Sequence, residues 1–235
     1  MVIRQRAIQA EDKHERYLAI LDAAERLLAR SPDRVASVAE VADEAGLAKG
    51  TVYLYFPSKE ELLLAVHERN VDAFFAALIA RLEGKGPTAI EDILALTHRH
   101  IVQPPLFLPL AARCLGLMAQ NVRSETSAAF MQRMAGRLER AGAGLERHFA
   151  ELKAGDGVAL LRHSYALIVG LWQMSASAGP EGAACLGSTA GGMRGGVVRS
   201  YPDELDRALR SLWVGTVGAR SVQPPVRGDI PGDRR

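Results

Sequence analysis

The segment at residues 37–62, SVAEVADEAGLAKGTVYLYFPSKEEL, constrains the fold of this chain more than any other. Ser37 and Glu40 have the S-x-x-E spacing of a capping box, which predicts that a helix begins there. Gly46 follows at the point where a helix end needs a residue that readily adopts a positive φ. These features predict a short helix that ends in a tight glycine turn.

A second short helix is expected at residues 48–54, with Val52 facing inward. Pro57 ends it, and Ser58 with Glu61 repeats the capping-box spacing, so a third helix should begin directly afterwards. Two capping boxes on either side of one glycine turn are typical of a helix-turn-helix. Such a unit places its second helix in the major groove of DNA.

The same segment resembles the DNA-binding domain of the tetracycline-repressor (TetR) family of bacterial transcription regulators. The resemblance covers residues 13–65, and beyond them only the helical architecture and the chain length fit the family. It implies a three-helix DNA-binding head, a helical body and a homodimer. The residues that carry it are Ile20, Leu21, Ala23, Ala24, Val38, Val41, Ala42, residues 45–47 (AGL), residues 49–53 (KGTVY) and residues 55–62 (YFPSKEEL).

Candidate DNA contacts lie on the second short helix and beside it. Lys49 stands at its N-terminal end, where a side chain reaches base edges and can contact guanine. Thr51 is short enough to touch a thymine methyl or a phosphate, and the resemblance implies a phosphate contact for Tyr53. Tyr55 either does the same or packs in the core. The predicted set is Ser37, Lys49, Gly50, Thr51, Tyr53, Tyr55 and Lys59.

Charge limits how the chain can hold DNA. The formal net charge is only +2, and residues 1–62 contain nine Lys and Arg against eleven Asp and Glu. A protein that grips DNA along a whole surface has a basic excess instead. We therefore expect affinity to come from a few well-placed cations, hydroxyls and backbone groups, doubled by a dimer.

The rest of the chain reads as helices separated by glycine and proline breaks, with no convincing strand. The fold class is all-α with about nine helices. It comprises a helix-turn-helix head at residues 13–65, a ligand-binding and dimerisation body at 66–217, and a disordered tail at 218–235. The other expected segments are a mobile arm at 1–12, helices at 13–30, 58–82, 88–103 (with a Thr88–Glu91 capping box), 106–120, 124–152 and 158–178, a flexible loop at 179–200, and a last helix from Pro202 or Asp203.

The body is rich in Leu, Phe and Met, and such helices can enclose a pocket. The resemblance implies a small-molecule effector, and the apolar side chains suggest a hydrophobic or amphipathic one. His98 or His100 would supply a polar anchor. Each candidate has the alternative of being plain core or surface. The candidate ligand residues are Phe107, Arg113 (as partner of an anionic group), Met118, Met131 and Met134.

The last two long helices carry wide apolar stripes and the two tryptophans, Trp172 and Trp213. A second copy can cover such a pair as a four-helix bundle, which is also the homodimer that the resemblance implies. Two heads then predict a palindromic DNA site with half-sites about 34–36 Å apart.

Other function classes receive no support from the sequence. None of the six histidines lies in an H-x-x-x-H motif, and Cys114 and Cys185 are far apart, so we expect no enzyme, no cofactor and no metal site. The polar N-terminus lacks an apolar signal core. Residues 158–179 carry Arg162 and His163, which makes them a poor membrane span. We expect a cytoplasmic protein without a membrane partner.

The sequence thus predicts a DNA-binding transcription regulator, most simply a ligand-responsive repressor. The alternative is a helical small-molecule- or protein-binding module whose head no longer reads DNA. It is motivated by the low charge of the head and by Leu54 on the second short helix. Substitution of Tyr53 or Lys49 separates the two, because only a regulator loses DNA binding while it keeps its fold.

Overall fold

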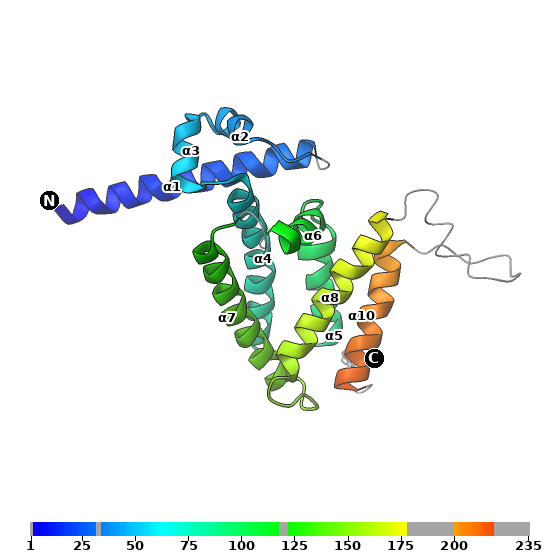
Figure 1. The fold of residues 1–235 in the computed structure, drawn as a ribbon. Coiled ribbons are helices and arrows are strands. Elements are labelled where there is room, and N and C mark those ends of the chain that lie inside the picture. The colour runs from blue at the N-terminus through cyan, green and yellow to red at the C-terminus, as the bar shows by residue number, and fades with distance from the viewer. Residues whose placement is uncertain (1, 32–33, 118–121, 178–199, 219–235) are drawn as a thin grey trace, which may run out of the picture.

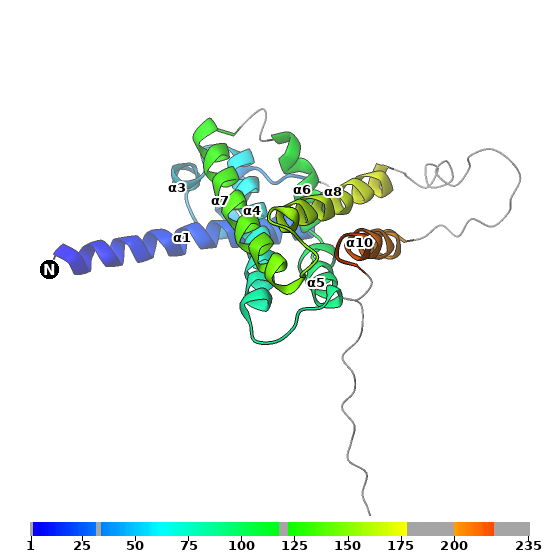
Figure 2. The same cartoon turned by 90° about the horizontal axis from the view of Figure 1, so that it is seen from below.

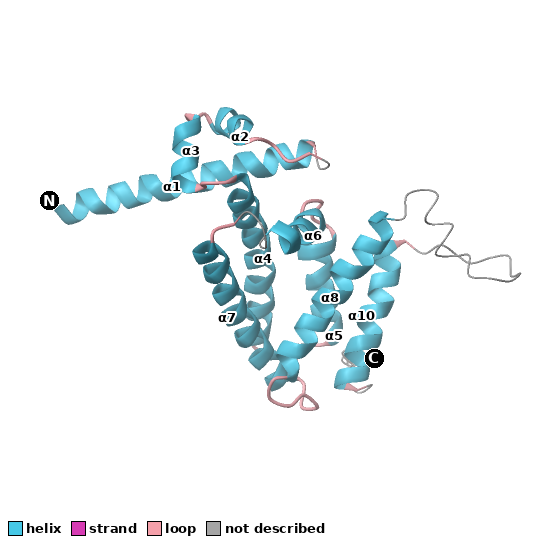
Figure 3. Cartoon of the chain, in the orientation of Figure 1, coloured by secondary structure: helices cyan, strands magenta, loops and turns pink. Residues whose placement is uncertain are grey.

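The computed structural model describes residues 2–31, 34–117, 122–177 and 200–218. Figure 3 shows that these ranges contain helices and loops but no strand, which confirms the all-α prediction. The elements are α1 (Val2–Arg30), α2 (Val38–Ala45), α3 (Lys49–Tyr55), α4 (Lys59–Glu83), α5 (Ile90–Thr97), the π-helical segment η1 (His98–Val102), α6 (Phe107–Leu117), α7 (Ser124–His148), α8 (Asp156–Ser177) and α10 (Tyr201–Val217).

Helices α1, α2 and α3 form a head across one end of the molecule (Figure 1). The predicted capping box closes α2, because Ser37 Oγ accepts a hydrogen bond from the Glu40 N–H (3.3 Å) and the Glu40 carboxylate accepts one from the Ser37 N–H (2.8 Å). Gly46 ends that helix with a φ of 67°. Val52 of α3 is buried in a core that also contains Ile20 and Val41. The helix-turn-helix therefore folds as its local signals predict.

Helix α4 connects the head to the body, running from beneath α1 down through the bundle (Figure 1). Ser58 caps it, since Ser58 Oγ accepts a hydrogen bond from the Glu61 N–H at 3.1 Å. Its first turns are buried on several sides, at Leu62, Leu63 and Leu64, because α4 packs against α1, α6 and α7. One continuous helix therefore belongs to both cores.

The body packs α5 to α10 around the lower part of α4 (Figures 1 and 2). Helices α8 and α10 lie side by side in both views and contact each other. Trp213 of α10 is buried, with its ring edge-on to Phe149 at 6.2 Å between centroids. The Trp213 Nε1–H also donates to Ser164 Oγ of α8 at 3.0 Å. The body core thus extends from α4 to α10.

The first helix is longer than predicted. It begins at Val2, so the mobile arm expected at residues 1–12 is wrong for residues 2–12. Those residues contain no glycine or proline, so no breaker stops the helix from extending toward the N-terminus. Figures 1 and 2 show this part of α1 projecting beyond the rest of the head.

The start of α5 also differs from the prediction. The S/T-x-x-E spacing points to Thr88 and Glu91, but the N-cap residue is Ala89. The Asp92 carboxylate accepts a hydrogen bond from the Ala89 N–H at 2.9 Å and pairs with Arg81 at 2.7 Å. Because Asp92 serves two donors in this position, the helix begins one residue later than the motif indicates.

Several predictions lie outside the described residues. They concern the loop at 179–199, the tail at 219–235, Met118 and Cys185. Of the helices that are described, none combines the length and the apolar character that crossing a bilayer requires.

Candidate DNA interface and ligand cavity

Helix α3 is anchored on one side and exposed on the other. Val52 has no exposed surface, whereas Leu54 is 84% exposed and Tyr53 is 42% exposed. Lys49 and Gly50 in the first turn are exposed as well. The Lys49 ammonium lies 5.8 Å from the centre of the Tyr53 ring. A short helix that presents a cation, a phenol and an apolar side chain outward has the form of a major-groove reading helix.

The remaining DNA candidates flank this helix. Thr51 is half-buried, and Tyr55 is half-buried against the head core, so the structure gives Tyr55 a packing contact. Ser37 is exposed at the start of α2. Lys59 is exposed at the start of α4, with its ammonium 3.8 Å from the Glu60 carboxylate. The N-terminal end of each of these two helices carries the positive end of the helix dipole, which attracts anions such as phosphate.

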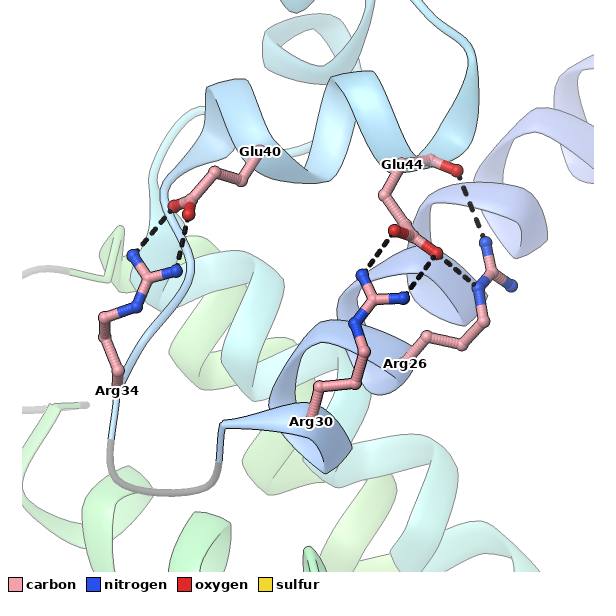
Figure 4. A network of polar contacts seen from close by, with 5 residues as sticks. All are labelled: Arg26, Arg30, Arg34, Glu40 and Glu44. Atoms are coloured by element: carbon pink, nitrogen blue, oxygen red, sulfur yellow. Dashed lines mark hydrogen bonds and ion pairs between the residues drawn. The ribbon is translucent and has the colours of Figure 1, made fainter.

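Arginines pair with two of the three carboxylates of α2, those of Glu40 and Glu44 (Figure 4). Glu44 pairs with Arg26 at 2.8 Å and with Arg30 at 2.5 Å, and Glu40 pairs with Arg34 at 2.5 Å. The hydrogen bonds from Arg30 and Arg26 lower the pKa of Glu44 to about 2, and those from Arg34 and Ser37 lower the pKa of Glu40 to about 2. Two negative charges of the head are thereby paired with three of its arginines, so the net charge of the head is unchanged and these arginines are engaged within the protein.

Two carboxylates of α4 are held by arginines of α7 and of the residue before it. Glu61 is buried and accepts hydrogen bonds from the Arg123 N–H (3.3 Å), Nε (2.8 Å) and Nη2 (3.0 Å). The Arg123 side chain lowers the pKa of Glu61. Two turns further on, Glu68 binds Arg133 at 2.6 Å and Arg137 at 3.0 Å. These contacts fasten α7 to the part of α4 that leaves the head.

A cavity of about 300 Å³ lies inside the body. Only two of its lining residues, Met131 of α7 and Arg162 of α8, are exposed, so it reaches the surface between these helices. The lining residues are His67, Val71, Phe74, Phe75, Ile93, Thr97, Ile101, Phe107, Ala111, Cys114, Phe130, Met131, Met134, Leu138, Leu161, Arg162, Ser164, Tyr165, Ile168, Leu209 and Trp213.

Both halves of this architecture match known family models. Residues 20–66 match the model of bacterial regulatory proteins of the tetR family, and residues 68–201 match that of the tetracyclin repressor-like C-terminal domain. This chain belongs to the TetR family. Members of the family are transcription regulators rather than enzymes.

Named relatives give the same picture for the N-terminal part. The fatty acid metabolism regulator protein of Bacillus subtilis (strain 168) is 30% identical over 90 residues, which is 38% of this chain and 46% of that protein. The transcriptional regulator EthR of Mycobacterium tuberculosis (strain H37Rv) is 40% identical over 79 residues, 34% of this chain and 37% of that protein. The chain spans less than half the length of these curated relatives.

Solved TetR structures match the whole fold. SmeT, the repressor of the Stenotrophomonas maltophilia multidrug efflux pump SmeDEF, has a TM-score of 0.55 at 21% identity over 91% of this chain and 96% of that one. PfmR of Thermus thermophilus has a TM-score of 0.50 at 20% identity over 85% and 98%. At these identities the similarity shows the fold alone. The family and the curated relatives favour a DNA-binding regulator over a module that no longer reads DNA.

The structure distributes the five predicted ligand residues unevenly. Phe107, Met131 and Met134 line the cavity of this TetR protein, and Met118 lies outside the described residues. Arg113 is not part of the wall. Helix α6 contributes positions 107, 111 and 114, which share one helical face, and position 113 points to a different face.

Sequence reasoning missed His67 and Tyr165, which line the cavity, while His98 and His100 are absent from its wall. His67 sits in the buried run of α4, and Tyr165 lies on the apolar stripe of α8. Each sequence pattern indicates a buried face but not what that face surrounds. The one signal in the sequence that could have identified His67 and Tyr165 as cavity residues is that each is a titratable residue inside an apolar stripe.

The polar groups of the cavity wall differ in whether they form hydrogen bonds within the protein. The hydroxyls of Thr97 and Ser164 donate to carbonyls one turn back in their own helices, at 2.9 and 2.8 Å. Among the described residues, His67 Nδ1 is buried without a hydrogen-bond partner. Burial lowers the pKa of His67 to about 4 and raises the pKa of Tyr165 to about 12. Both groups are therefore uncharged at neutral pH.

Proposed function

We propose that this protein is a transcription repressor that binds a palindromic DNA operator as a homodimer and is released by a hydrophobic or amphipathic small molecule. The observation that carries the proposal is the outer face of α3, where Lys49, Tyr53 and Leu54 are exposed around the buried anchor Val52. Double-stranded DNA is the partner that such a face fits. A regulator of DNA works where the chromosome lies, so the proposal includes a bacterial cytoplasmic location.

The homodimer is supported by the outer side of α8 and α10. Met174 of α8 is 54% exposed, and Trp172, Leu171 and Leu212 are only half-buried against the body core. An antiparallel helix pair with such apolar side chains buries them when a second copy completes a four-helix bundle. Two tethered heads then multiply the affinity of each.

The proposed response to a ligand runs through α7 and α4. Met131 and Met134 of α7 line the cavity, while the same helix holds Glu68 of α4 through Arg133. A ligand that shifts α7 therefore acts on α4, which begins in the head at Lys59. The coupling between ligand and DNA sites is typically about 1–3 kcal/mol in such systems.

Replacing Lys49 by alanine should weaken operator binding by about 1–3 kcal/mol per head, because the variant loses a cation at the reading end of α3. The operator comes first from selection on a pool of random duplex DNA at a stated salt concentration. Affinities of the wild type and the variant are then compared on the enriched palindrome.

Lys153→Ala is the matched control, since it removes the same charge in the α7–α8 loop at the far end of the body (Figure 1). It should leave the affinity unchanged. The proposal does not survive if a folded dimer enriches no palindrome, or if the Lys49 variant binds the palindrome as tightly as the wild type does.

Replacing Gly50 by alanine should keep or raise stability by up to about 1 kcal/mol while it weakens DNA binding at least about tenfold. A Cβ at Gly50 meets no other atom within 4 Å, so the fold itself does not require glycine there. We infer that position 50 is glycine because DNA approaches the α3 backbone closely there. Urea unfolding and operator titration measure the two effects, and a Gly50→Ala variant with unchanged DNA affinity contradicts the attribution.

A further inference from the structure

The cavity wall in the body contains one buried nitrogen that the protein leaves without a hydrogen bond, and a phenol on α8. His67 of α4 is 2% exposed, its Nδ1 has no partner among the described residues, and its ring packs edge-on against Phe107 at 5.4 Å. Tyr165 of α8 is half-buried and lines the same cavity. A buried polar atom is rarely left without a partner, so His67 points to a ligand that completes it.

The charge of the cavity wall restricts that ligand. No carboxylate lines the described wall, and its one cationic side chain, Arg162, is exposed at the surface end between α7 and α8. The buried part contains apolar side chains and the neutral groups of His67 and Tyr165. An ion placed there has no counter-charge, and burial of an unpaired charge is strongly unfavourable.

We propose that the effector is an uncharged, mainly apolar molecule with one carbonyl, amide or hydroxyl group that hydrogen-bonds His67 and Tyr165 in the buried part of the cavity. A neutral imidazole has one hydrogen-bond donor and one acceptor, and a phenol can act as both. A donor or an acceptor group of an amide or an alcohol therefore finds a hydrogen-bond partner there. The inference rests on the proposed function, because it names the class of effector that the regulator binds.

The position of His67 connects this contact to the head. His67 lies nine residues after the cap residue Ser58, which is about 13 Å along α4 at the rise of an α-helix. The next residue, Glu68, carries the ion pair with Arg133 of α7. A ligand bound at His67 therefore touches α4 at the turn where α7 is fastened to it.

The test compares octanamide with octanoate, which share an alkyl chain and differ in head-group charge. Titration calorimetry of the full chain at neutral pH should show octanamide binding at least about tenfold more tightly. His67→Phe keeps an aromatic ring against Phe107 but removes both nitrogens, and should lower octanamide affinity about tenfold. Propylbenzene, which makes no hydrogen bond, should bind this variant at least as well as the wild type.

Arg162→Gln tests for an anionic ligand, because it should weaken any octanoate binding that depends on the guanidinium, while Lys153→Gln, outside the cavity wall, should leave octanamide affinity unchanged. The inference is overturned if octanoate binds more tightly through Arg162, if His67→Phe leaves octanamide binding intact, or if neither octanamide nor propylbenzene binds. If the chain selects a palindrome but binds no octanamide, the inference is refuted and the proposed function stands. A chain that binds octanamide through His67 but selects no palindrome refutes the proposed function alone.

Discussion

Replacing Gly157 by alanine should destabilise the protein by about 3 kcal/mol, which is the upper end of the range for an overpacked site. Helices α7 and α8 approach each other so closely that a Cβ at Gly157 lies 2.3 Å from the Gly142 carbonyl oxygen. A Cβ at Gly142 in turn lies 2.7 Å from Val158 Cγ2 and 2.8 Å from the Val158 nitrogen. Because backbone atoms are involved, relief requires that the two helices separate, which loosens the body core between them.

The control is Gly136→Ala, on the same helix α7. A Cβ at Gly136 meets nothing within 4 Å, so this substitution should raise stability by roughly 0.5–1 kcal/mol through lower entropy of the unfolded chain. Urea unfolding at one fixed protein concentration measures both variants, since the stability of a dimer depends on concentration. Equal effects of the two substitutions contradict the close crossing of α7 and α8.

The contrast between these glycines shows where sequence reasoning stops. Gly136, Gly142 and Gly144 look alike in the sequence, as residues that weaken a helix or permit close packing. The structure separates them, because a Cβ at Gly142 meets α8, one at Gly144 comes within 3.0 Å of Leu82, and one at Gly136 faces open space. Which partner helix lies opposite is a tertiary fact that no local pattern contains.

The helix-turn-helix was predictable for the opposite reason. The Ser37–Glu40 capping box and the positive φ of Gly46 are fixed by residues within one turn of each other, and both occur as predicted. The same kind of signal was wrong at Thr88, where Arg81 from a different helix favours Asp92 as the capping carboxylate. Local rules hold until a distant side chain competes.

The cavity was predictable only in part, because its wall comes from α4, α5, η1, α6, α7, α8 and α10. Apolar faces of α6 and α7 suggested Phe107, Met131 and Met134, which do line it. The polar groups that give the wall its chemistry, His67 and Tyr165, lie on other helices. Their importance depends on the convergence of these faces, which appears only in the folded chain.

Burial of neutral His67 should make the protein lose about 3 kcal/mol of stability as the pH falls from about 6.5 to about 4. Burial lowers the pKa of the folded-state imidazole to about 4 from its ordinary value of 6.5, although nearby Glu68 opposes the shift. Between these two values the unfolded chain binds a proton that the folded chain excludes. The contribution of His67 to the free energy of unfolding is therefore fully present above pH 6.5, and it is lost as the pH falls through this window.

His67→Phe should remove this part of the pH dependence, so the difference in unfolding free energy between wild type and variant should change by about 3 kcal/mol across the window. Glu40 and Glu44 lose their stabilising effect at lower pH, from 4.5 toward 2, and cancel in the difference. His163→Asn is the control, because His163 is exposed on α8. Parallel curves for wild type and His67→Phe would mean that water or a charge reaches the imidazole. The buried part of the cavity would then not be the apolar, ion-excluding site that the effector proposal requires.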